Sequence, residues 1–178
     1  MSVNTKPVVE YLDGQSEAIV GQWHALTLRQ YDPGTSHFLQ HDQDAFRNPA
    51  GQILKENLSV LFGALLKDLS AENYRQNLDA IIRLRAVQDI SASEAVSFIF
   101  GLKKIVRTEL AGQAQLDLHG SCCATFEARI DAMALLAFDL YTGCREQMCE
   151  IKLNEGRRRI HVSERMASKQ PGKSKDSP

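Results

Sequence analysis

Residues 91–110, SASEAVSFIFGLKKIVRTEL, decide the fold class. Ser91 and Glu94 have the spacing of a capping box, in which the two side chains accept hydrogen bonds from each other's backbone N–H groups at a helix start. Apolar residues then recur every three or four positions, which places them on one face of an α-helix. The stretch therefore predicts an amphipathic helix that ends near Ala111-Gly112.

The same apolar spacing runs through most of the chain, and no stretch shows the two-residue alternation typical of strands. The predicted helices cover residues 8–30, with weak points at Gly14 and Gly21 and a break expected near Gly14, a short turn at 35–39, and residues 49–68, 71–84, 91–110 and 121–151 or beyond. Asn48-Pro49 and Ser70 stand at two of the helix starts, where such residues are favoured. We predict an all-α fold of five or six helices.

The last predicted helix is the longest, because no Pro interrupts it and its first Gly is Gly143. Residues 130–141 are apolar on nearly every side of this helix. Such a helix is typical of a position enclosed by neighbouring helices. We therefore expect residues 130–141 to be surrounded by the rest of the domain.

The length of 178 residues fits one domain, which we place at residues 1–163, followed by a basic disordered tail at 164–178. Residues 151–178 hold eight Lys and Arg against three Asp and Glu. The longest apolar run, residues 132–138, is too short to span a membrane, and no secretory signal opens the chain. We expect a cytoplasmic protein without membrane insertion.

No catalytic motif is recognisable. The chain has no glycine-rich phosphate loop and no nucleophile elbow, so we predict that it is not an enzyme. His37 and His41 have a metal-ligand spacing, but we interpret them as a surface pair and predict no metal. The basic run 157–159 lacks interleaved aromatic residues, which favours a solvated helix end or docking segment over nucleic-acid binding.

The four cysteines fall in the last third of the chain, at Cys122, Cys123, Cys144 and Cys149. None has the Cys-x-x-Cys spacing, so we interpret them as buried structural thiols in a reducing compartment. A redox-sensing thiol is the alternative. We predict no cofactor, although a haem needs no local motif beyond one histidine.

Three sets of residues are candidates for a site or an interface. The first set is Arg83, Arg85 and Gln88, next to Asp89, which could form a polar network or contact a ligand. We favour the alternative that these side chains satisfy carbonyl groups at a helix C-terminus. Aromatic residues that could line a cofactor pocket are Trp23, Phe98 and Tyr141. Tyr141, Met148 and Ile151 extend the apolar stripe of the last helix and are candidates for a dimer interface.

Several of these motifs together resemble a known family. They are residues 44–51 (DAFRNPAG), 82–95 (IRLRAVQDISASEA), 98–102 and 129–158, the last with FDLY at 138–141 and CRE at 144–146. From about Gln22 to Arg159 the chain resembles the N-terminal domain of the RsbT co-antagonist protein RsbRD.

The resemblance implies a sensor-type helical module, related to the haem-free, globin-like domains that project from the stressosome, a bacterial signalling assembly. Such domains pair and pass a signal through a C-terminal helix to an output domain. After Ser163 this chain has only fifteen residues. We therefore expect it to stand alone and to act through a partner.

Two functions remain open. The first is a non-enzymatic regulatory domain that forms a homodimer and docks to an unidentified partner protein in bacterial stress signalling. The second is a small-molecule or redox-cofactor protein, using haem or thiols. The resemblance to single-domain relatives would make this second protein an accessory of a respiratory or sulfur-metabolism complex.

Overall fold

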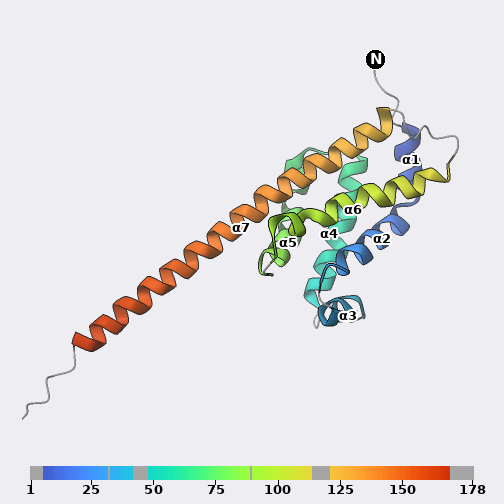
Figure 1. Ribbon diagram of the computed structural model, residues 1–178. Helices are drawn as coiled ribbons and strands as arrows, with labels where there is room; N and C mark the ends of the chain where they lie inside the picture. The colour runs from blue at the N-terminus through green and yellow to red at the C-terminus, as the bar shows by residue number, and fades with distance from the viewer. Residues whose placement is uncertain (1–5, 32, 42–47, 89, 114–120, 169–178) are drawn as a thin grey trace, which may run out of the picture. The chain divides into compact units, whose positions relative to one another are not determined.

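The computed structural model describes residues 6–31, 33–41, 48–88, 90–113 and 121–168, and the helices in these ranges confirm the all-α class (Figure 1). The chain divides into two compact units, residues 1–142 and residues 143–178. The helices are α1 (Lys6–Gly14), α2 (Ser16–Leu28), α3 (Pro33–His41), α4 (Pro49–Leu66), α5 (Ala71–Ala86), α6 (Ala92–Ala111) and α7 (Ser121–Ser168).

The described ranges hold seven helices where the sequence predicted five or six. The predicted weak point near Gly14 is a break between α1 and α2, and the predicted short turn at 35–39 is part of a full helix, α3. α7 continues to Ser168, five residues into the range assigned to the tail. Residues 169–178 lie outside the described residues.

Local capping explains two helix starts as the sequence predicted. At α6, the Ser91 N–H donates to Glu94 Oε2 over 2.9 Å and the Glu94 N–H donates to Ser91 Oγ over 3.3 Å, which completes the capping box. At α4, the Gly51 N–H donates to Asn48 Oδ1 over 2.9 Å, with Pro49 in the first turn. Ser70 occupies the N-cap position of α5 but its side chain makes no capping bond.

In the core of residues 1–142, α2 packs against both α4 and α6, and α4 also packs against α5 (Figure 1). The rings of Trp23 and Phe98 stack with centroids 6.0 Å apart, and Trp23 Nε1 donates to the Phe98 carbonyl oxygen over 2.8 Å. Both side chains are fully buried. This pair fixes α2 against α6 through an apolar contact and a hydrogen bond at once.

Ion pairs and a hydrogen bond tie residues 121–142 of α7 to α6 and to the end of α4. Arg107 of α6 makes a bidentate contact with Glu127, at 2.6 and 2.7 Å, which lowers the pKa of that carboxyl group. Lys103 Nζ forms an ion pair with Asp131 Oδ1 over 2.7 Å. Arg129 donates to the Leu65 carbonyl oxygen over 2.8 Å and so satisfies a C-terminal carbonyl of α4.

The expectation that residues 130–141 are enclosed was wrong for one face of α7. Ile130, Met133 and Ala137 are buried, but Leu135 is 70% exposed and Phe138 is 47% exposed. At 100° per residue, Leu135 points away from the buried face and Phe138 lies on its flank, and the other helices of residues 1–142 leave both partly uncovered. A helix segment that is apolar all round is therefore not necessarily packed against other helices on every face.

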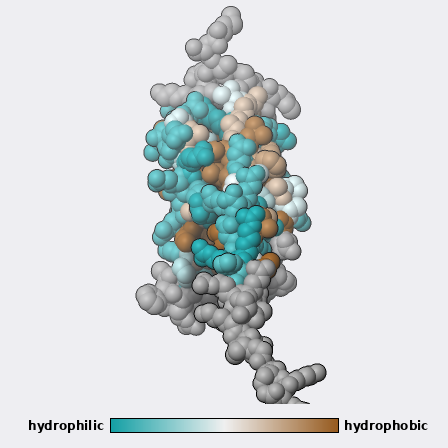
Figure 2. Space-filling model, turned by 90° about the vertical axis from the view of Figure 1, so that its left-hand side faces the viewer, coloured by the Kyte–Doolittle hydropathy of each residue, from teal (hydrophilic) through white to brown (hydrophobic). Residues whose placement is uncertain are grey.

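The surface is mainly polar on the face shown in Figure 2, where brown hydrophobic patches are small and separated by teal residues. Of the helices in the described ranges, none combines the length and apolar character needed to cross a membrane.

Candidate functional site

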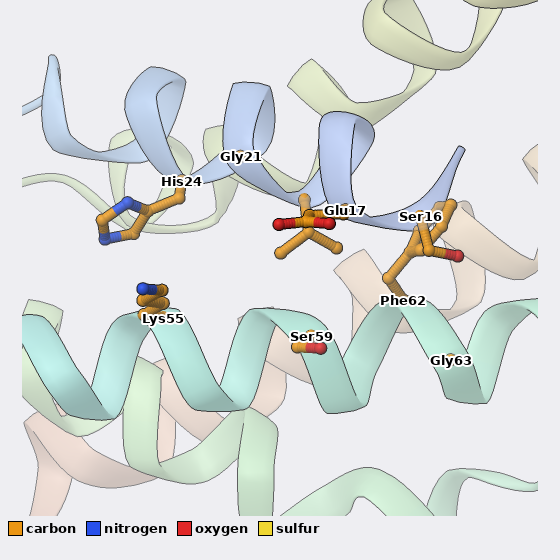
Figure 3. Close-up of a pocket in the computed structure, with 9 residues that line it drawn as sticks. Ser16, Glu17, Gly21, His24, Lys55, Ser59, Phe62 and Gly63 are labelled. Atoms are coloured by element: carbon orange, nitrogen blue, oxygen red, sulfur yellow. The ribbon is translucent and has the colours of Figure 1, made fainter. Parts of the chain in front are cut away.

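A groove of about 590 Å³ runs between α2 and α4 (Figure 3). This volume is within the range of ~300–1,000 Å³ that is typical of small-molecule sites. We call it the α2–α4 groove. Its lining residues are Ser16, Glu17, Val20, Gly21 and His24 from α2 and Lys55, Ser59, Phe62 and Gly63 from α4.

Two glycines keep the groove open. A Cβ atom built on Gly21 or on Gly63 would meet no atom within 4 Å. Gly51 differs, because a Cβ there would lie 2.7 Å from the Leu39 carbonyl oxygen, so close packing requires that glycine. Glycine inside a helix costs about 1 kcal/mol relative to alanine. Gly21 and Gly63 thus weaken α2 and α4 without a packing requirement for either.

Charged side chains mark one end of the groove. His24 of α2 and Lys55 of α4 face each other there, and Glu17 lies further along α2, above Ser59 (Figure 3). The Nε2 atom of His24 is buried and has no hydrogen-bond partner. Burial, and secondly the positive charge of Lys55, lower the pKa of His24 from its ordinary value of 6.5. The structure therefore favours the neutral imidazole.

The lowered pKa of His24 predicts that the protein loses stability in mildly acidic solution. Below pH 6.5 the unfolded chain takes up a proton at His24 that the folded chain resists, so the free energy of unfolding falls as the pH falls through this window. We expect the urea midpoint of the wild type to fall between about pH 7 and about pH 5. The His24→Gln variant should show a smaller fall.

The exposed His161 of α7 provides the matched control. His161→Gln should retain the pH dependence of the wild type. Equal pH dependence in the wild type and in His24→Gln would contradict the prediction, because it would show that folding does not resist protonation of His24.

Arg85 forms a second polar centre, inside the core. Its side chain is 1% exposed, and its guanidinium carbon lies 5.5 Å from the ring centroid of Tyr31 and 5.6 Å from that of Phe98. Nε donates to the Ala95 carbonyl oxygen over 2.8 Å, and Nη2 donates to Gln30 Oε1 and the Glu94 carbonyl oxygen. Burial lowers the pKa of Arg85, yet a guanidinium stays charged at neutral pH.

Arg83, Arg85 and Gln88 do not come together in one network. Arg83 lies on the exposed side of α5 and forms an ion pair with Asp79 over 2.6 Å. Gln88 donates to the Leu84 carbonyl oxygen, as expected for a residue that satisfies the C-terminus of its own helix. Only Arg85 turns inward, and its carbonyl partners belong to the first turn of α6. Asp89 lies outside the described residues.

The three aromatic candidates for a cofactor pocket occupy core positions. Trp23 and Phe98 stack on each other, and the Tyr141 hydroxyl donates to the Ile90 carbonyl oxygen over 2.5 Å. Tyr141 is only 4% exposed, so it does not lie on a surface of this chain. Its two companions in the predicted interface, Met148 and Ile151, are half-buried and exposed, respectively.

None of the described cysteines forms a disulfide bond: Cys123 and Cys144 are buried and Cys149 is exposed. The side chains of Cys122 and His41 lie outside the described residues. Among the described residues no three His, Cys, Asp or Glu side chains form a group that could hold a metal ion.

Sequence reasoning missed the α2–α4 groove. A signal was present in Gly21 and Gly63, which interrupt two good helix-forming stretches, but they are 42 positions apart. It also left Gln30 and Tyr31 out of the surroundings of Arg85. The inward turn of Arg85 itself could have been predicted, because it follows Leu78 by seven residues and Ile82 by three, on the apolar face of α5.

Comparison with known families matches residues 17–154 to the model of the RsbT co-antagonist protein rsbRD N-terminal domain. No curated protein and no solved structure matched the chain. The matched range includes residues 17–28 of α2 and all of α4, α5 and α6, and with them Arg85 and every lining residue of the α2–α4 groove except Ser16. This family consists of signalling sensor domains of the stressosome type. Because the match covers most of its length, the chain belongs to the RsbRD N-terminal domain family.

Proposed function

We propose that the chain is a non-enzymatic regulatory sensor domain that works in the cytoplasm, forms a homodimer through residues 143–161 of α7 and docks to a partner protein. Its family supports a signalling role with protein partners. One structural observation carries the dimer: large apolar side chains are exposed on this part of α7. They are Ile151 at 58%, Leu153 at 58% and Ile160 at 60%.

Leu153 and Ile160 form a stripe because they are one heptad apart and so lie on the same side of the helix. Cys149, which is also exposed, precedes Leu153 by four residues and lies on that side too. A helix pair buries such a stripe when each copy covers the other. We call Cys149, Leu153 and Ile160 the α7 stripe.

The charge pattern favours a second copy of this chain as the occupant of the α7 stripe. Residues 143–155 hold three Glu against one Arg and one Lys, whereas residues 156–161 hold three Arg and no Asp or Glu. Antiparallel pairing of two copies places each acidic part against the basic part of the other. The surface is thus complementary to itself, as a two-fold interface requires.

Light scattering on the purified chain tests the dimer. The wild type should have twice the chain mass of 19.9 kDa, and the double variant Leu153→Glu/Ile160→Glu should have the mass of one chain. Four glutamates facing each other in a pair of helices would repel and would replace the apolar contact.

A matched control adds the same two charges beside the α7 stripe. Asn154→Glu/His161→Glu changes two exposed positions, each turned by about 100° from a stripe residue, and should leave the dimer intact. A wild type that stays monomeric at micromolar concentrations, or a stripe variant that stays dimeric, would contradict the proposed dimer.

A further inference from the structure

We infer that the α2–α4 groove binds a small organic monoanion, whose negative group lies between His24 and Lys55 and whose apolar body extends past Gly21 toward Phe62. This goes beyond the proposed function, because it names the class of molecule that the domain senses. It does not depend on the dimer, since all the lining residues belong to residues 16–24 and 55–63.

The shape of the groove is the first argument. Its volume of about 590 Å³ exceeds the space that one or two water molecules need. The glycines at 21 and 63 lie on the two facing helices, and a side chain on either would extend into empty space. Gly21 is exposed and Gly63 is half-buried, and alanine would stabilise either helix by about 1 kcal/mol, so helix stability does not explain the two glycines.

The positive end is the second argument. Lys55 supplies an ammonium group, and His24 has a ring nitrogen, Nε2, with no hydrogen-bond partner in the described part of the chain. An anion beside Lys55 would accept a hydrogen bond from its ammonium group, and it would accept one from a protonated His24 once the ring turns its buried Nε2 toward the groove. Such charge-assisted bonds are stronger than neutral ones. The negative charge would also favour the protonated imidazole.

Glu17 limits the ligand to a single negative charge. It precedes His24 by seven residues, which is two turns or about 10 Å along α2. A second anionic group at the far end of a ligand would therefore approach the Glu17 carboxylate. Phe62, buried at this side of the groove, offers an apolar contact instead.

The test is a titration of the ¹⁵N-labelled full chain with 4-phenylbutyrate, followed by amide chemical shifts. Two companion probes separate charge from apolar contact: 4-phenylbutan-1-ol has the same body without the charge, and acetate has the charge without the body. We expect saturable shifts at residues 16–24 and 55–63 with 4-phenylbutyrate. The alcohol should bind at least about tenfold more weakly, and acetate should not saturate.

Two variants locate the site. Gly21→Leu places a side chain in the groove, where its Cβ meets no atom within 4 Å, and should abolish binding of 4-phenylbutyrate. Lys55→Gln should reduce the affinity for this probe to that of the alcohol. The matched controls are Gly143→Leu, on α7, where a Cβ also meets no atom within 4 Å, and Lys104→Gln, on the exposed side of α6. Both controls should bind as the wild type does.

Amide shifts that map outside the α2–α4 groove, or unchanged binding of 4-phenylbutyrate by Gly21→Leu, would overturn the groove as the binding site. Equal affinity for 4-phenylbutyrate and 4-phenylbutan-1-ol would overturn the proposal that the ligand is an anion. Loss of saturable shifts in Gly143→Leu as well would overturn the assignment to the groove. A monomeric chain that binds 4-phenylbutyrate would refute the dimer alone, and a dimer without saturable binding of this probe would refute the ligand alone.

Discussion

The Trp23→Ala variant is expected to lose about 3–5 kcal/mol of the free energy of unfolding, with a fall in the melting temperature of about 10 °C or more. Trp23 is fully buried and stacks on Phe98. Alanine leaves a large cavity there, removes the ring contact and deletes the hydrogen bond from Nε1 to the Phe98 carbonyl oxygen. A cavity of this kind forms where α2 meets α6, so both helices lose support.

Trp23→Phe is the matched variant, since it keeps an aromatic ring against Phe98 but removes the hydrogen bond. Its loss should be smaller, about 1–2 kcal/mol. Urea unfolding followed by far-ultraviolet circular dichroism measures both variants, because Trp23 is the single tryptophan and its fluorescence disappears with it. A loss below about 1 kcal/mol in Trp23→Ala would contradict the central packing role.

The second large effect is expected at Arg85, where substitution by lysine should lower the free energy of unfolding more than substitution by methionine. Arg85→Lys should cost about 3–5 kcal/mol, because the buried charge remains while an ammonium group cannot reproduce the three hydrogen bonds of the guanidinium. Arg85→Met removes the charge together with its need for partners. The methionine variant should therefore lose less, about 1–3 kcal/mol.

The pH dependence distinguishes this explanation from a simple loss of packing. Burial lowers the pKa of a lysine, so Arg85→Lys gains stability as the pH rises from about 7 to about 10, because the unfolded chain there holds more protons than the folded one. Arg85→Met has no such group and should follow the wild type. Urea midpoints of the three proteins measure the difference. A lysine variant as stable as the methionine variant at neutral pH would contradict the prediction.

Both effects depend on contacts that the sequence indicates only in part. The apolar stripe of α5 continues through Leu78 and Ile82 to Arg85, so periodicity alone places Arg85 inside and Arg83 outside. It does not say which acceptors meet the guanidinium. Gln30 is 55 positions away, and it reaches Arg85 only because α2 packs beside α6.

The aromatic candidates illustrate the same limit. Trp23, Phe98 and Tyr141 were selected as large residues that could line a pocket, and their burial shows instead that they fill the core. The α2–α4 groove contains two positions without side chains, Gly21 and Gly63. A search of the sequence for catalytic or ligand-binding side chains does not find such positions.

Most of the helices and two of their caps could be predicted from local sequence, because helix periodicity and the capping contacts of Ser91 with Glu94 and of Asn48 with Gly51 act over three or four residues. Which helix faces remain uncovered could not be predicted in this way. Leu135 and Phe138 are exposed, and the groove stays open beside His24, because burial depends on which helices arrive as neighbours, and contacts between distant segments set that arrangement.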